Sequence, residues 1–86
     1  MLDMEKIYTE LIAFRMEQIS TDEQKYERLS SQIEVANNRG ASDKEIAFLN
    51  ERLNRVATAL NGRRANLVNL HNKLAEIRGE KNEANS

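Results

Sequence analysis

The strongest constraint on the fold is a heptad repeat in the second half of the chain. Ten positions follow one another in alternating steps of three and four residues: Ile46, Leu49, Leu53, Val56, Leu60, Arg63, Leu67, Leu70, Leu74 and Ile77. Nine of the ten are apolar, which is the a/d pattern of a helix that packs along one seam against another helix. The pattern therefore predicts one long helix over residues 43–78, with its apolar seam covered by a partner helix.

A less regular repeat of the same kind runs through the first half. The a positions are Ile12, Ile19, Tyr26 and Ile33, and the d positions are Tyr8, Arg15, Asp22, Leu29 and Ala36. Ser20 and Glu23 have the spacing of a capping box, which could begin a new helix at that point. The heptad phase continues through this segment without proline or glycine, so we predict one continuous helix over residues 2–38.

The segment between the two helices carries signals for a stop and a start. Gly40 suits the left-handed conformation that ends many helices, and Arg39 complements the negative end of the first helix dipole. Ser42 can cap the next helix, with Glu45 at the third helical position. A turn at residues 39–42 therefore predicts an all-α fold, an antiparallel helical hairpin with a coiled-coil seam.

Charge supports the hairpin and marks its middle. Residues 2–38 carry eight acids and four bases, whereas residues 43–78 carry four acids and seven bases, so the two helices attract each other. When the chain is folded at the turn, Arg15, Asp22 and Arg63 fall in neighbouring layers of the seam. We predict that Asp22 contacts Arg63 and that this polar layer sets the alignment of the helices. The alternative is that both side chains extend outward into solvent.

Composition narrows the domain organisation and the chemistry. Eighty-six residues correspond to one small domain, predicted as a hairpin over residues 1–79 and a disordered polar tail over residues 80–86 after Gly79. The chain has no cysteine and one histidine, His71, whose neighbours on the helix are apolar. We therefore expect no catalytic, cofactor-binding or metal-binding residues, and no enzyme activity.

The expected location is the cytoplasm. No apolar run approaches the length of a membrane span, and Asp3 and Glu5 stand where a signal peptide would be basic. The net charge of −1 gives the whole molecule no general attraction to nucleic acid or to anionic lipid. A membrane partner is therefore not expected.

One apolar stripe lies off the seam near the N-terminus. Met4, Ile7, Leu11 and Phe14 follow steps of three, four and three, at heptad positions g, c, g and c. They cannot all face the second helix while the a and d positions do so. Covering them within the hairpin would fall to Val68 and Ala75, at b positions, and these are too small for the task. The stripe is therefore predicted to bind another chain.

These features predict a non-enzymatic protein–protein interaction module, of the kind that serves as an oligomerisation unit, adaptor, assembly factor or small chaperone. We expect a homodimer that forms a four-helix bundle, because a single hairpin of this size buries little apolar surface. A different protein partner is the competing expectation. The alternative function is nucleic-acid binding through the basic segment 52–64, which contains Arg52, Arg55, Arg63 and Arg64.

Overall fold

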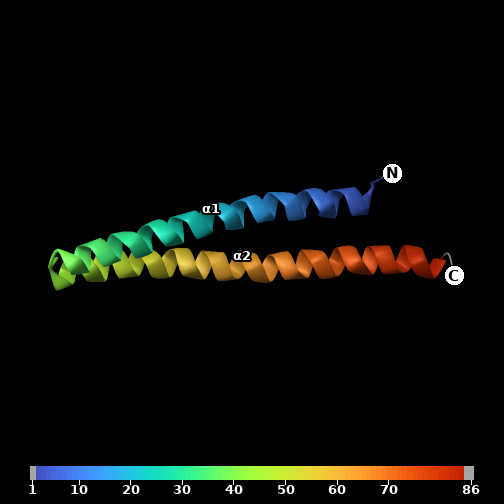
Figure 1. The fold of residues 1–86 in the computed structure, drawn as a ribbon. Coiled ribbons are helices and arrows are strands. Elements are labelled where there is room, and N and C mark those ends of the chain that lie inside the picture. Colours follow the sequence, from blue (N-terminus) through green and yellow to red (C-terminus); the bar gives the residue numbers. More distant parts are fainter. Residues whose placement is uncertain (1, 85–86) are drawn as a thin grey trace.

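The fold is a hairpin of two long helices. The structure, a computed structural model, describes residues 2–84, and it describes side chains as far as Gly79. Helix α1 spans Met4–Asn38 and helix α2 spans Asp43–Ala84, and the two lie side by side in opposite directions (Figure 1). The molecule measures 66 × 17 × 15 Å. This arrangement confirms the predicted all-α hairpin, and α1 continues through Ser20 without a break.

The turn uses the residues that the sequence predicts. Gly40 has a φ of 73°, in the left-handed region. Its N–H donates to the carbonyl of Asn37 at 3.2 Å, and the N–H of Ala41 donates to the carbonyl of Ala36 at 2.9 Å. These two bonds form a Schellman motif, which satisfies carbonyl groups that the end of a helix would otherwise leave unpaired.

The start of α2 confirms the expected cap. The Ser42 hydroxyl accepts a hydrogen bond of 3.2 Å from the N–H of Glu45, and the Ser42 carbonyl accepts one from the N–H of Ile46. The Glu45 carboxylate forms an ion pair with the Arg39 guanidinium across the turn. The Glu45 side chain thus ties the end of α1 to the start of α2, in addition to favouring the positive end of the α2 dipole.

The far end of α2 differs from the sequence prediction. The helix continues past Gly79 to Ala84, so the predicted stop at Gly79 is wrong, and residues 80–84 of the predicted tail are helical. Residues 85–86 of that tail lie outside the described part of the chain. Gly79 does not adopt a positive φ, and Glu80, Lys81, Glu83 and Ala84, which follow it, have good to moderate helix propensity. A single glycine without a left-handed conformation weakens a helix but does not end it.

The core is one thin seam between the helices. All ten predicted seam positions of α2 are at least partly buried, and Leu60 and Leu74 are buried. In α1 the buried residues are Ile12, Ile19, Asp22, Leu29 and Ala36. Tyr26 is the exception among the predicted a positions, because it is 39% exposed and lies toward one side of the seam. Each helix therefore buries a single stripe and leaves its flanking surface open.

Two glycines should respond to alanine substitution with opposite signs. Gly40→Ala places a Cβ in the left-handed region and should destabilise the protein by about 1 kcal/mol. Gly62 lies within α2, and a Cβ added there would have no heavy atom within 4 Å. Gly62→Ala should therefore stabilise the protein by about 1 kcal/mol, because alanine has the higher helix propensity. Urea unfolding followed by circular dichroism measures both changes. Destabilisation by Gly62→Ala would contradict the open surroundings described for that position.

Candidate functional site: the polar layer and the two sides of the hairpin

The polar layer in the middle of the seam contains the predicted contact. Arg63 Nη1 donates a hydrogen bond to Asp22 Oδ2, and the two groups form an ion pair between the helices. The Asp22 side chain is only 6% exposed, whereas the Arg63 side chain is 34% exposed. Arg63 therefore covers a buried carboxylate while its own guanidinium keeps some contact with water. That this pair sets the alignment of the helices stays a prediction.

The third predicted member of the layer, Arg15, does not join this pair. Its Nη1 donates to Gln18 Oε1 at 2.8 Å, one turn along the same helix. Its Nε is buried without a hydrogen-bond partner, and so is Oδ1 of Asn66 on α2. In the polar centre of the hairpin, the Asp22 carboxylate thus has a hydrogen-bond partner, whereas the Arg15 guanidinium has a partner for Nη1 and none for its buried Nε.

The predicted interface stripe is largely open to solvent. Phe14 is 58% exposed, Leu11 is 45% exposed and Met4 is 44% exposed, whereas Ile7 is partly buried. These are high values for large apolar side chains that lie on one helix at helical spacing. Among residues 2–79, whose side chains the structure describes, none from α2 buries Leu11 or Phe14.

The grooves beside the seam define two sides of the hairpin. One groove is lined at e, a and b positions of both helices, and the other is lined at g, c and d positions of both helices. This grouping is what an antiparallel pair requires, because g positions of one helix lie beside g positions of the other. We call the g/c side the Phe14 face and the e/b side the Tyr26 face.

The two sides of the hairpin give a different reason why Val68 and Ala75 do not cover the stripe. Val68 and Ala75 occupy b positions, so they belong to the Tyr26 face, whereas Leu11 and Phe14 belong to the Phe14 face. Val68 is itself 58% exposed. The two residues therefore fail to cover the stripe because they point to the other side of the hairpin, and their small size is not the reason.

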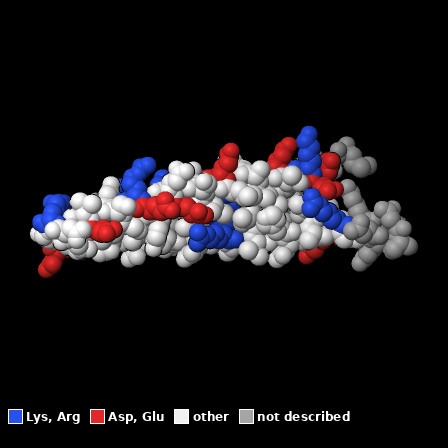
Figure 2. All heavy atoms as spheres, viewed as in Figure 1, with Lys and Arg blue, Asp and Glu red and all other residues white. Residues whose placement is uncertain are grey.

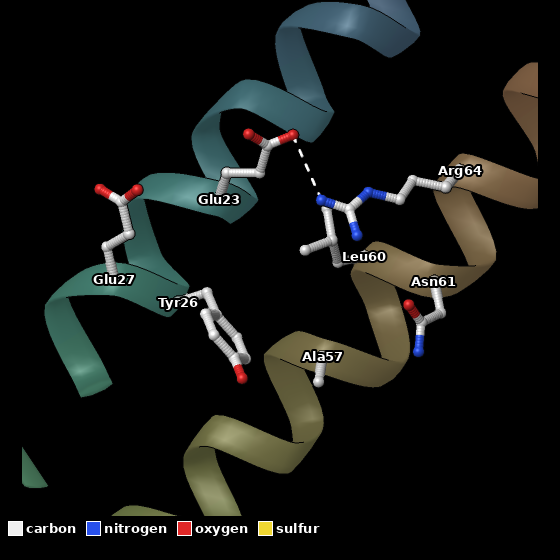
Figure 3. Close-up of a pocket in the computed structure, with 7 residues that line it drawn as sticks. All are labelled: Glu23, Tyr26, Glu27, Ala57, Leu60, Asn61 and Arg64. Carbon is white, nitrogen blue, oxygen red and sulfur yellow. Dashed lines mark hydrogen bonds and ion pairs between the residues drawn. The ribbon is translucent and has the colours of Figure 1, made fainter.

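The Tyr26 face holds a shallow pocket of about 440 Å³ (Figure 3). Its lining residues are Glu23, Tyr26, Glu27, Ala57, Leu60, Asn61 and Arg64. The Tyr26 ring points toward α2, and Glu23 meets Arg64 in an ion pair of 3.5 Å. Both members of that pair are about half exposed, so water competes for each of them. The polar lining makes this pocket a poor site for an apolar partner, although Met16 and Val68 are exposed elsewhere on the Tyr26 face.

The Phe14 face holds a basic groove of about 460 Å³ nearer the turn. Its lining residues are Lys25, Arg28, Leu29, Gln32, Arg52, Arg55 and Val56. Arg55 pairs with Glu51 at 2.7 Å, and the Arg52 guanidinium lies 5.9 Å from the centre of the Phe48 ring. Lys25 and Arg28 have no ion pair within residues 2–79. Four cations from two helices thus meet in one groove with incomplete neutralisation.

The basic segment 52–64 is divided between different surroundings. Arg63 turns into the seam toward Asp22, and Arg64 pairs with Glu23 on the Tyr26 face. Arg52 and Arg55 lie in the basic groove of the Phe14 face. The segment does not present its four arginines as one surface, as a helix that follows a nucleic-acid backbone would.

Sequence reasoning missed two exposed apolar residues on the Phe14 face. Val35 and Phe48 both occupy c positions near the turn, and they are 62% and 58% exposed. Extending the g/c rows along both helices would have found them. Within residues 2–79, five of the nine exposed large apolar side chains lie in these rows, including Met4, Leu11 and Phe14. The Phe14 face is therefore the more apolar side, with its basic groove between two apolar ends.

The face of the hairpin that Figure 2 shows combines separate groups of charged side chains with wide uncharged areas. Neither helix contains, within the described residues, an apolar segment long enough to cross a membrane. Among those same residues, histidine and acidic side chains form no group of three that could hold a metal ion. No protein-family model, no curated protein and no solved structure matches the chain. The two faces of the hairpin are thus the basis for proposing a function.

Proposed function

We propose that the protein is a non-enzymatic interaction module that self-associates through its Phe14 face, two hairpins forming a four-helix bundle. The observation that carries the proposal is the exposure of Leu11 and Phe14 on the same side as Val35 and Phe48. Soluble chains rarely leave such rows of large apolar side chains uncovered, and a second hairpin supplies a cover of matching length.

The dimensions of the hairpin support this proposal. The face formed by both helices is as long as the 35 residues of α1, about 52 Å, and 17 Å wide, which gives roughly 900 Å² and is enough for the ~800 Å² that each partner buries in a typical stable interface. In the part of the chain whose side chains the structure describes, the seam buries only six apolar side chains: Ile12, Ile19, Leu29, Ala36, Leu60 and Leu74. Burial of the Phe14 face would add a second apolar layer to each helix, which is how four-helix bundles gain their stability.

The direct test is the double substitution Leu11→Glu and Phe14→Glu. Light scattering should give twice the chain mass of 9.9 kDa for the unchanged protein and the single chain mass for the variant. The physical reason is that the interface loses two large apolar anchors and must desolvate two charged groups in their place. Circular dichroism should show that the helices remain.

A matched control uses the other side of the hairpin. Met16 and Val68 are 54% and 58% exposed and belong to the Tyr26 face, so Met16→Glu with Val68→Glu adds the same charges there. This variant should keep the dimer mass. A single-chain mass for the unchanged protein, or a dimer that persists in the Leu11 and Phe14 variant, would contradict the proposal.

A further inference from the structure

We infer that the second copy binds with its hairpin reversed, so that α1 of one copy lies antiparallel to α1 of the other and acids of one copy meet the basic groove of its partner. This inference rests on the proposed self-association. It adds the orientation of the two hairpins and the side chains that select it. The observations that carry it are the positions of charges on the Phe14 face and on the f row of α1 at its outer edge.

The cations of the Phe14 face gather at one level of the hairpin. Lys25 and Arg28 precede Gly40 by 15 and 12 residues, and Arg52 and Arg55 follow it by 12 and 15. All four side chains line one groove. Because α1 and α2 rise by the same distance per residue, these cations lie at nearly equal distances from the turn.

The acids that flank the apolar stripe lie at a different level. Glu10 and Glu17 occupy f positions beside Leu11 and Phe14, in the half of α1 that is far from the turn. Both are exposed, and neither takes part in an ion pair within residues 2–79. The f row lies next to the c row, so the outer edge of the Phe14 face is acidic over the first half of α1, whereas the face itself is basic around Lys25 and Arg28.

Two symmetric arrangements can stack one Phe14 face on another. If the two turns lie at the same end, α1 of each copy covers α2 of its partner at the same level. The cations at 25 and 28 then meet those at 52 and 55 from both copies, and like charges brought together in an interface are strongly unfavourable. This arrangement also leaves Glu10 and Glu17 far from any cation of the groove.

If the turns lie at opposite ends, α1 covers α1 of the partner in the reverse direction. Residues 10–17 of one copy then lie beside residues 25–28 of the other, so Glu10 and Glu17 approach Lys25 and Arg28. Phe14 comes to the same level as these cations, where its ring can contact a guanidinium, as Phe48 does with Arg52 within one chain. The end of the stripe near Met4 then lies beside the segment of the partner's α1 that contains Val35. The acids at 10 and 17 meet cations of the basic groove in this arrangement only.

The orientation is measured by the distance between two spin labels. The chain has no cysteine, so Lys44→Cys supplies one labelling site, on an exposed residue close to the turn. Opposed turns place the labels about 50–60 Å apart, whereas adjacent turns place them about 20–30 Å apart. Pulsed electron paramagnetic resonance should give the longer distance. The shorter distance would overturn the reversed orientation and leave self-association intact, whereas a monomeric mass would overturn both proposals.

Charge reversal tests the pairing between copies. Glu10→Lys with Glu17→Lys should weaken the dimer by about tenfold or more in analytical ultracentrifugation. Adding Lys25→Glu and Arg28→Glu to that variant should restore most of the affinity, because the pairs are then reversed and complementary again. Loss of affinity without such recovery would overturn the pairing.

The control for net charge lies on the Tyr26 face. Glu27 and Glu34 are exposed b-position acids of α1, and Glu27→Lys with Glu34→Lys changes the net charge by the same amount as the variant at residues 10 and 17. This control should dissociate no more than a few-fold more readily than the unchanged protein. Equal weakening by the two variants would show that net charge alone acts, and it would overturn the inference.

Discussion

Replacing Arg63 by leucine should destabilise the hairpin by about 2–4 kcal/mol, whereas replacing Arg63 and Asp22 together by leucine should stabilise it. The Asp22 side chain is 6% exposed, and its carboxylate accepts a hydrogen bond from Arg63. Removing Arg63 alone leaves that carboxylate in the seam without its partner. Removing both groups leaves an apolar layer in a seam whose remaining layers are apolar apart from the one that holds Arg15. Urea unfolding at one fixed protein concentration measures both changes, because association also contributes to stability.

The neighbouring arginine provides the control. Arg64 pairs with Glu23 at 3.5 Å, and both side chains are about half exposed. Arg64→Leu should therefore change stability by no more than about 1 kcal/mol. If Arg63→Leu changes the free energy of unfolding equally little, then the buried Asp22 carboxylate does not depend on Arg63, and the prediction is wrong. A less stable Asp22 and Arg63 double variant would contradict the view that the pair gives alignment at the expense of stability.

Leu60→Ala should be the most damaging truncation of an apolar side chain, with a loss of about 2–3 kcal/mol in the free energy of unfolding. Leu60 is 6% exposed and lies one turn before Arg63, next to the polar layer. Its loss removes one of six buried apolar side chains and admits water toward Asp22. The expected cost lies toward the lower end for a buried leucine, because a thin two-helix seam can close around a cavity.

Val68→Ala is the matched truncation on the same helix. Val68 is 58% exposed, so the change should stay within about 0.5 kcal/mol of the unchanged protein. Thermal unfolding and urea unfolding should rank the two variants in the same order. A similar loss for both substitutions would mean that Val68 is buried in solution, which would point to an interface on the Tyr26 face.

The sequence by itself determined both helices, the turn between them and the seam. The alternating spacing from Ile46 to Ile77 fixes which side of α2 is buried, because a side chain's direction around a helix follows from its position in the heptad. The turn was also predictable, since Gly40 and Ser42 act through local backbone chemistry. These features depend on residues within a few positions of one another.

Only the tertiary structure decided how the flanking rows of the two helices combine. A heptad assigns each residue a direction around its own helix, but it does not state which row of the other helix lies beside it. That choice depends on the opposite direction of the helices, which places Val68 and Phe14 on different sides and gathers the groove from residues 25–28 and 52–55. The contact between Asp22 and Arg63 followed from the layers of the seam, but the acid that pairs with Arg64 did not, because a long exposed side chain selects among several acids according to the stagger of the helices. The end of α2 depended on a further balance, in which favourable residues after Gly79 outweighed the cost of one glycine in a helix.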